Sequence, residues 1–136
     1  PSGVNVDLLR RLMEAGLLPI ISPVSRSTDC ALGATLNVNG DDAAAAIAAA
    51  LEAEELLLVS DVAGVLLEEQ PVLSLGPEDA HRLIEDGTAR GGMAAKLQAA
   101  LSALDGGVQR VRISDIAAIA DATRGTVLTR EGSMCA

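Results

Sequence analysis

Three short motifs combine residue types that can bind phosphate groups or hold a small polar ligand. The first is residues 37–42 (NVNGDD), in which two amides and two acids directly precede an apolar helical pattern. A single Asn or Asp in this position caps a helix, because its side-chain oxygen accepts a hydrogen bond from a backbone N–H of the first turn. Since capping needs only one such residue, the motif also allows Asn37 or Asn39 to bind a small ligand while an acid fixes a nearby cation.

The second motif, residues 60–64 (SDVAG), directly follows an apolar run. A turn that contains glycine is common after any strand and carries no chemistry by itself. At the carboxyl end of a parallel strand, however, the Ser60 hydroxyl, the Asp61 carboxylate and free backbone N–H groups can contact the ribose or phosphates of a nucleotide.

The third motif, residues 90–96 (RGGMAAK), opens another helical pattern. Its glycines let a phosphate approach the backbone, the start of a helix presents unpaired N–H groups, and Lys96 follows about one turn later. The motif is not the GxxxxGK[ST] phosphate loop, and two glycines at a helix start are by themselves a weak signal. It therefore predicts an anion site only in combination with the other two motifs.

The elements that position these motifs alternate between strands and helices. The run at residues 55–60 (ELLLVS) is continuously apolar, which is typical of a central strand covered on both faces. Alternating strands and helices predict an α/β sandwich with a largely parallel sheet, in which ligands bind beyond the carboxyl ends of the strands. This rule selects Ser60 and Asp61, and also Ser114 and Asp115, as places for a site.

Periodicity and capping residues predict the remaining elements. In the helix over residues 41–53 we expect one apolar face formed by Ala43, Ile47, Ala50 and Leu51. His81 lies in an amphipathic pattern without a second His or Cys nearby, and is interpreted as a surface or boundary residue. The full set comprises helices over residues 5–16, 41–53, 76–87, 91–107 and 116–122, strands over residues 17–22, 55–60, 108–113 and 126–129, and a loop or hairpin over residues 25–35.

Composition limits the possible classes of protein. The 136 residues have room for one domain, residues 1–136, and 49% apolar residues without Phe, Tyr or Trp predict a core of aliphatic side chains. A formal charge of −9 argues against a nucleic-acid partner, and no apolar stretch is long enough to span a membrane. Cys30 and Cys135 lie far apart without a CxxC motif, so neither a disulfide framework nor a protein-built metal site is expected. We expect a cytoplasmic protein.

The three motifs occur in an order that resembles the C-terminal half of the acetylglutamate kinases in the amino acid kinase family. The matching stretches cover most of the chain and are NVNGDDAAAAIAAAL, LLLVSDVAGVL, IEDGTARGGMAAKLQAAL and GGVQRVRI. The resemblance implies a three-layer α/β sandwich of the carbamate kinase-like type with a mainly parallel central sheet. It also implies an enzyme of arginine biosynthesis that uses ATP and Mg²⁺ to phosphorylate the side-chain carboxylate of N-acetylglutamate.

The resemblance also assigns roles to individual residues. By position, Asn37 holds the acylated amino-acid substrate, Asp41 organises the catalytic lysines, and Lys96 stabilises charge on the phosphoryl group in transfer. The residues that the resemblance assigns to the ATP pocket are Ser60, Asp61, Gly64, Gly92 and Met93. These assignments agree with the chemistry, because phosphoryl transfer needs positioning and positive charge rather than a covalent nucleophile.

The chain also departs from the family pattern. It lacks an N-terminal half with its Gly-Lys motif, glycine pair and substrate-binding arginine, and it opens at Pro1 without an initiator Met, so we expect a fragment that alone turns over little substrate. Gly40 replaces a frequent Ala, and residues 114–125 form a shorter stretch than expected. Alternatives are a kinase for aminoadipate or glutamate, and a regulatory domain that kept the fold without the chemistry. The missing half and a homo-oligomer are the expected partners.

Overall fold

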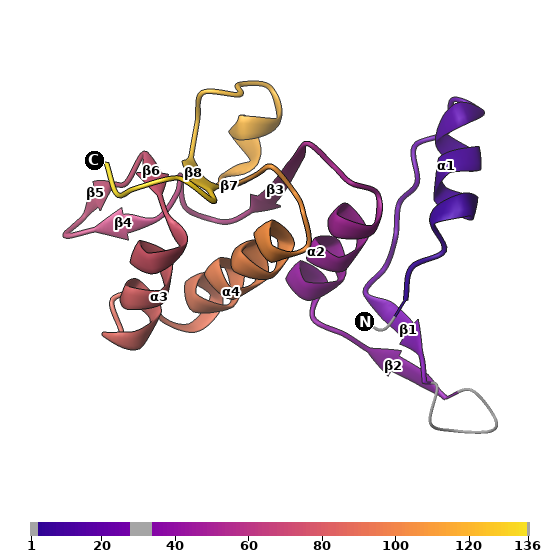
Figure 1. Cartoon of the computed structure of the whole chain (residues 1–136), viewed down its shortest axis with the longest axis horizontal. Coiled ribbons are helices and arrows are strands. Elements are labelled where there is room, and N and C mark those ends of the chain that lie inside the picture. Colours follow the sequence, from indigo (N-terminus) through magenta and orange to yellow (C-terminus); the bar gives the residue numbers. More distant parts are fainter. Residues whose placement is uncertain (1–2, 28–33, 136) are drawn as a thin grey trace.

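The computed structural model describes residues 3–27 and 34–135 of the chain (Figure 1). Asp29, Cys30 and Gly33, which belong to the expected loop, lie outside the described residues. None of the helices in the described ranges is long and apolar enough to cross a membrane. His81 is exposed on a helix, which confirms its interpretation as a surface residue.

A four-stranded sheet organises the main body of the molecule. Its strands are β3 (Glu55–Val59), β7 (Arg110–Ser114), β8 (Thr126–Thr129) and β6 (Ser74–Leu75), in the order β3-β7-β8-β6. The β3–β7 and β6–β8 pairs are parallel, whereas β7 and β8 are antiparallel. The α/β class and the mainly parallel sheet are therefore confirmed. The sheet is mixed because β8 runs antiparallel to β7.

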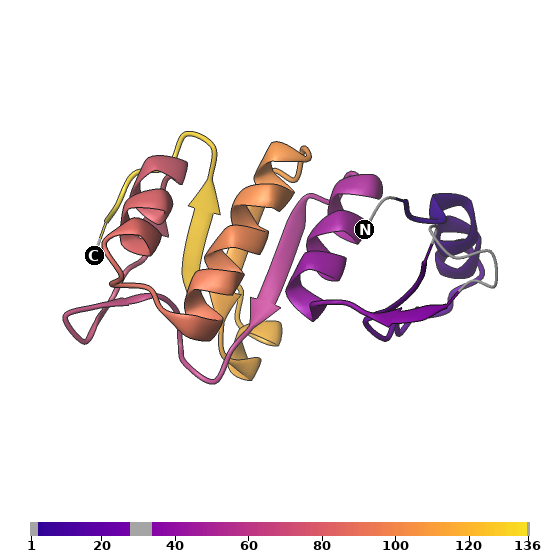
Figure 2. The same ribbon diagram turned by 90° about the horizontal axis from the view of Figure 1, so that it is seen from below.

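Three helices cover one face of this sheet, and a short 3-10 helix lies on the other (Figures 1 and 2). The covering helices are α2 (Gly40–Ala50), α3 (Pro77–Glu85) and α4 (Gly91–Asp105), and the 3-10 helix is η1 (Ile116–Ile119). Side chains alternate between the faces of a strand, and the alternate residues on the helix side form the core. These residues are Leu56, Leu58, Val111, Ile113 and Leu128, all buried.

The helices begin and end where their flanking residues dictate. Asn39 caps α2, and its Oδ1 accepts hydrogen bonds from the N–H groups of Asp41 (2.8 Å) and Asp42 (3.2 Å). Pro77 occupies the first turn of α3, where its missing N–H costs nothing. The buried side of α4 includes Leu97 and Leu104, each at most 1% exposed, and each contributes about 2 kcal/mol by burial.

The N-terminal part forms a separate group of elements at one end of the molecule (Figure 1). It comprises α1 (Val6–Glu14), β1 (Val24–Arg26) and β2 (Thr35–Asn37), and β1 and β2 pair as an antiparallel hairpin. Asn5 caps α1, because its Oδ1 accepts a hydrogen bond from the Leu8 N–H at 3.1 Å. No residue of α1 is fully buried, although its sequence has a distinct apolar face.

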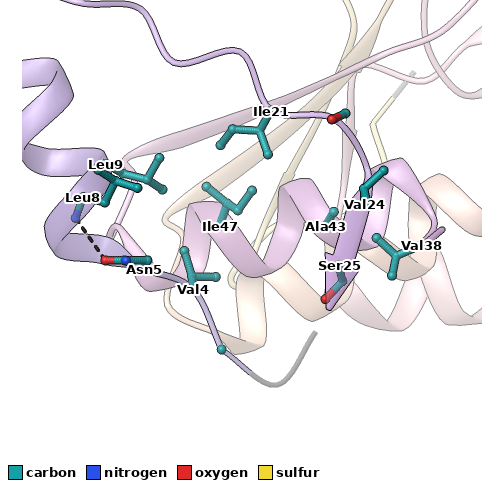
Figure 3. Close-up of a pocket in the computed structure, with 12 residues that line it drawn as sticks. Val4, Asn5, Leu8, Leu9, Ile21, Val24, Ser25, Val38, Ala43 and Ile47 are labelled. Atoms are coloured by element: carbon teal, nitrogen blue, oxygen red, sulfur yellow. Dashed lines mark hydrogen bonds between the residues drawn. The ribbon is translucent and has the colours of Figure 1, made fainter. Parts of the chain in front are cut away.

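One prediction about this part of the chain is wrong. Residues 17–22 form no strand, because no described strand pairs with them. In α2 the predicted apolar face, which includes Ala43 and Ile47, borders open pockets, one of which Figure 3 shows, whereas the buried residues are Ala45 and Ala48. Residues 17–22 and this face of α2 both have apolar patterns typical of buried elements, but no described part of the chain covers them.

No turn signal in the sequence predicts the small hairpin that follows the second motif. Strands β4 (Leu66–Leu67) and β5 (Gln70–Pro71) are joined by Glu68 and Glu69, both in the left-handed region with φ of 49° and 64°. A two-residue turn of this type strongly favours Asn-Gly or Asp-Gly, because these residues tolerate positive φ. Because glutamate is not typical of such a turn, the turn could not be predicted from the sequence, and the backbone of Glu68 and Glu69 is strained.

Replacing this pair by the residues that the turn favours should stabilise the protein. We expect Glu68→Asn with Glu69→Gly to raise the free energy of unfolding by about 1 kcal/mol, measured by urea denaturation. The double substitution Glu54→Gln with Glu85→Gln is the matched control, because it removes two exposed negative charges from positions without positive φ. An equal gain in both double variants would assign the effect to net charge and contradict the account of strain.

Candidate functional site

All of the predicted site residues of the second and third motifs except Gly64 meet at the carboxyl end of β3. The Ser60 N–H donates to the Ser114 carbonyl (2.7 Å), and the Ser60 hydroxyl donates to Asp61 Oδ1 (3.2 Å). These contacts hold the turn after β3 over the start of α4. An open pocket of about 510 Å³ lies between them and is lined by Val59, Ser60, Asp61, Val62, Gly92, Met93 and Lys96.

The start of α4 presents an uncapped helix terminus to this pocket. Gly91 has a φ of +53°, a conformation that favours glycine, and the Arg90 side chain turns back to donate to the Gly87 carbonyl instead of capping the helix. No bond from the Gly92 N–H to another described residue is found, and Gly92 lines the pocket. The positive end of the 15-residue helix therefore faces the pocket, with Lys96 one turn further on.

An ion pair connects the third motif to the first. Lys96 Nζ lies 3.0 Å from Asp41 Oδ1 and 3.1 Å from Asp41 Oδ2, and the two side chains are only 17% and 24% exposed. Asp41 is itself held at the start of α2, where its backbone N–H donates to the Asn39 cap. The structure thus brings together Asp41 and Lys96, which lie 55 residues apart in the sequence.

Asn37 and Gly64 lie outside the pocket that Lys96 lines. Asn37 ends β2 and is exposed, while Asn39 is engaged as a helix cap. Gly64 is buried and lines an adjoining cavity of about 290 Å³, which shares Val62 and Met93 with the first. With a φ of +153°, a Cβ at Gly64 would lie 2.7 Å from Thr126 Oγ1, so this position also has a packing role.

The carboxyl end of β7, which the sequence also selected for a site, holds the turn after β3 in place. Ser114 is fully buried, and its hydroxyl donates to the Ala63 carbonyl at 3.3 Å. Asp115 caps η1 and pairs with Arg124 at 2.7 Å, and the hydrogen bond from Arg124 lowers the pKa of Asp115. Neither Ser114 nor Asp115 lines the pocket of Lys96; both fix the loops beside it.

A buried arginine that sequence reasoning missed holds the segment after β7. Arg112 Nη1 donates to the carbonyls of Ala118, Asp121 and Arg124, and Arg112 Nε donates to Glu55 Oε1 at 2.7 Å. Glu55 also accepts from Arg110. Burial alone would raise the pKa of Glu55, but the hydrogen bonds from Arg112 and Arg110 lower it below its ordinary value. The sequence signal that could have identified Arg112 is a charged residue within an otherwise apolar strand.

The described residues contain no group of three or more His, Cys, Asp and Glu side chains that could enclose a metal ion. Mg²⁺ is commonly bound through one or two carboxylates together with the phosphates of a nucleotide. Asp61 is exposed at the pocket and offers one such carboxylate, so the residues fit a Mg²⁺ that arrives with a nucleotide. Val59 and Val62, which sequence reasoning did not select, supply the apolar part of the pocket wall.

The structure is an α/β fold with a mixed sheet, and an uncapped helix terminus and a lysine lie together at the carboxyl edge of that sheet. This arrangement is chemically suited to bind an anion. The chain belongs to the amino acid kinase family, whose sequence pattern matches residues 2–115. An acetylglutamate kinase from Cereibacter sphaeroides is 48% identical over 116 residues, which are 85% of this chain and 39% of that protein. The chain therefore spans well under half the length of this relative.

Two solved structures confirm the predicted fold. N-acetylglutamate synthase from Neisseria gonorrhoeae, complexed with coenzyme A and L-arginine, superposes with a TM-score of 0.84 at 25% identity, over 96% of this chain and 32% of that one. Carbamate kinase from Giardia lamblia bound to AMP-PNP gives a TM-score of 0.76 at 19% identity, over 93% of this chain and 44% of that one. The predicted carbamate kinase-like fold is thus confirmed.

The lowered pKa of Glu55 allows a test of the ion pair between Glu55 and Arg112, the arginine that holds the segment after β7. Because its folded-state pKa is lowered, Glu55 stabilises the protein above the ordinary pKa of 4.5, and this stabilisation is lost as pH falls through the folded value. We expect Glu55→Gln to lower the free energy of unfolding by about 2 kcal/mol at pH 7. The difference from the unmodified protein should shrink below pH 4.5.

Denaturant unfolding at pH 7, 5 and 3.5 measures this difference. Glu54→Gln is the matched control, because the neighbouring glutamate is exposed and should contribute little at any pH. A deficit in Glu55→Gln that stays constant between pH 7 and 3.5 would contradict a stabilising role of the charged carboxylate.

Proposed function

We propose that this chain supplies the nucleotide-binding half of an ATP-dependent kinase that phosphorylates the side-chain carboxylate of N-acetylglutamate, a step of arginine biosynthesis. The observation that carries the proposal is the ion pair between Lys96 and Asp41 beside the pocket of Ser60, Asp61 and Gly92. Membership of the amino acid kinase family and the 48% identity to an acetylglutamate kinase support it. A cytoplasmic location stays a prediction.

The pocket suits an adenine nucleotide with its phosphates toward α4. The Gly92 N–H and the positive end of the helix stabilise phosphate oxygens, and Lys96 adds a full positive charge one turn later. Asp61 would repel phosphates directly, so it suits a ribose hydroxyl or a Mg²⁺ that the phosphates share. The adjoining cavity beside Gly64 and Met93 offers apolar surface for the base.

The proposed reaction needs positive charge, because a carboxylate oxygen attacks the γ-phosphorus of a nucleotide that is itself negative. Mg²⁺ bound to the triphosphate neutralises part of this charge. Lys96 stabilises the charge on the phosphoryl oxygens in transfer, and Asp41 holds the ammonium group at a fixed place. No covalent intermediate on the protein is required, because phosphoryl transfer needs positioning and positive charge rather than a covalent nucleophile.

The acceptor substrate would be contacted by Asn37. Of the two amides in the first motif, Asn39 is used as a helix cap, whereas the exposed Asn37 is placed four residues before Asp41. An amide side chain can both donate to and accept from an acylated amino acid. Kinases for glutamate or aminoadipate are the alternatives, and a comparison of these three substrates in an assembled enzyme distinguishes them.

A non-catalytic domain is the second candidate function. It is favoured by the superposition on 32% of an N-acetylglutamate synthase, because this fold then also occurs in an enzyme that is not named for phosphoryl transfer. The retained Lys96–Asp41 pair argues for the kinase, because a domain without phosphoryl chemistry has no need of a lysine at the helix start. Nucleotide binding separates the two. Because the chain spans 39% of the kinase relative, we expect binding without appreciable turnover from the chain alone.

Removal of the lysine side chain tests the proposed nucleotide site. We expect titration calorimetry with AMP-PNP and Mg²⁺ to show weak binding to the chain, and Lys96→Ala to weaken it at least about 10-fold, since a charge-assisted contact to phosphate is lost. Arg10→Ala removes the same charge from an exposed position on α1 and should bind like the unmodified chain.

A second variant separates the roles of the two paired residues. Asp41→Asn retains the positive charge of Lys96, although it removes the carboxylate that positions the ammonium group. It also removes a negative charge near the phosphates, so nucleotide binding should be kept or tightened. No binding at millimolar nucleotide, or equal affinities for Lys96→Ala and Arg10→Ala, would sink the nucleotide site and favour the non-catalytic alternative.

A further inference from the structure

The turn at residues 61–64 is held by hydroxyl groups from other strands rather than by its own backbone. No bond from the N–H groups of these residues to another described residue is found. The Ser114 hydroxyl donates to the Ala63 carbonyl, and the hydroxyl of Thr126, the first residue of β8, accepts from the N–H of Val65 directly after the turn. Because the turn has no ladder or helix of its own, these side chains decide where it lies.

The Thr126 hydroxyl is inserted between the two chain segments at the base of the β4–β5 hairpin. Its Oγ1 accepts a hydrogen bond from the Val65 N–H at 2.8 Å and donates one to the Val72 carbonyl at 2.6 Å. The Val72 N–H donates directly to the Val65 carbonyl at 2.9 Å. Opposite residues of an antiparallel pair normally exchange two direct bonds. Here the hydroxyl takes the place of the second bond, so β8 takes part in the bonding of the hairpin.

The same side chain limits how closely Gly64 can approach β8. Thr126 is fully buried, and a Cβ on Gly64 would lie 2.7 Å from Thr126 Oγ1 and 3.1 Å from the Thr126 backbone nitrogen. The backbone of Gly64 therefore lies directly against Thr126. The hydroxyl and this contact together fix residues 64 and 65 relative to the sheet.

Residues 64 and 65 belong to one wall of the adjoining cavity of about 290 Å³. This wall consists of residues 62 and 64–66, and the opposite wall comes from the end of α3, the connection to α4 and the start of α4. The opposite wall has its own support, because the Ala89 N–H donates to the Leu83 carbonyl at 2.7 Å. Thr126 does not line the cavity. It therefore acts on the cavity only through residues 64 and 65, which it holds at a set distance from the opposite wall.

We propose that Thr126 is a positioning residue for the base of the nucleotide: it contacts no ligand and sets the width of the cavity that takes the base. This inference rests on the proposed function, in which the base enters this cavity and the phosphates lie beside Lys96. The pocket beside Lys96 shares Val62 with the cavity but is lined by neither Gly64 nor Val65. A displacement of residues 64 and 65 therefore weakens binding of the base and leaves binding of the phosphates unchanged.

Two probes separate the base from the phosphates. AMP-PNP with Mg²⁺ engages both parts of the site, whereas tripolyphosphate with Mg²⁺ engages the phosphate part alone. Phosphorus NMR titrations with the chain measure both affinities, including those in the millimolar range. A smaller folded fraction lowers both apparent affinities by the same factor, so a loss of stability leaves their ratio unchanged.

Thr126→Val removes the hydroxyl and keeps the shape of the side chain. We expect it to weaken AMP-PNP binding at least about 5-fold and to leave tripolyphosphate binding within about 2-fold. Thr126→Ser retains the hydroxyl and should keep both affinities within about 2-fold of the unmodified chain. Thr129→Val is the matched control, because it makes the same exchange at the other end of β8 and lines neither space, so it should change neither affinity.

A milder variant covers the case in which Thr126→Val does not fold. Thr126→Val leaves a buried N–H and a buried carbonyl without a partner, which destabilises the native state. Thr126→Cys then takes its place, because a thiol is a weaker donor and acceptor than a hydroxyl. It should weaken AMP-PNP binding at least about 2-fold more than tripolyphosphate binding.

The ratio of the two affinities decides the outcome. Equal changes for both probes in Thr126→Val, or no change for either, overturn the role of Thr126 and leave the nucleotide site standing. So does a Thr126→Ser variant that loses as much AMP-PNP affinity as Thr126→Val, since the loss would then not follow the hydroxyl. Tripolyphosphate that does not bind the unmodified chain contradicts the separation of base from phosphates. An unmodified chain that binds neither probe refutes the nucleotide site itself, so failure of the proposed function is distinguishable from failure of this inference.

Discussion

The contact between Lys96 and Asp41 is the constraint on which the geometry of the site depends. It joins the first turn of α2 to the first turns of α4, and both helices rest on the same face of the sheet. A partly buried ion pair adds little to stability, because the attraction is offset by the loss of water around each charge. Its main consequence is positional: it fixes the ammonium group beside the turn that follows β3.

The composition of the core makes this contact possible. Where α2 and α4 approach each other, a Cβ on Gly106 would lie only 2.6 Å from the Ala49 Cβ, so small residues set the distance between the two helices. A core without aromatic side chains keeps this spacing short along the helix pair. The turn after β3 is fixed from the other side by Ser114 and Thr126, whose hydroxyls satisfy backbone groups of residues 63, 65 and 72.

Much of this arrangement could be predicted from the sequence, because it depends on local patterns. The apolar period of α4, the caps at Asn5 and Asn39, and the glycines before Lys96 all specify their elements within a few residues. The rule that ligands bind at the carboxyl ends of parallel strands selected Ser60 and Asp61, which line one pocket together with Lys96 of the third motif. The other strand end that the rule selected, at Ser114 and Asp115, does not line this pocket. The roles assigned to the site residues, Asn37 and Gly64 included, stay predictions.

The features that the sequence did not predict have a common physical cause. Whether a strand is paired and whether a helix face is buried depend on distant parts of the chain, not on the local sequence. The pattern of residues 17–22 is that of a strand, but a strand exists only where another pairs with it. The face of α2 around Ile47 is apolar, but the core of the described chain lies on the side of Ala45 and Ala48. The hairpin at Glu68 and Glu69 was not predicted, because glutamates are unusual at turn positions with positive φ. The role of Arg112 was not predicted, because a buried arginine in a strand is stabilised by carbonyl groups from a different segment of the chain.

The chain contains a single lysine, Lys96, which permits a direct measurement of the central claim. An acyl-phosphate derivative of ATP transfers its acyl group to an amine held near the bound phosphates, and peptide mass spectrometry locates the modified residue. The account predicts modification of Lys96 that exceeds that of the N-terminal amino group and is suppressed by excess ATP with Mg²⁺. Modification of Lys96 that ATP leaves unchanged, or that is no faster than that of the N-terminal amine, would contradict a nucleotide site at the start of α4.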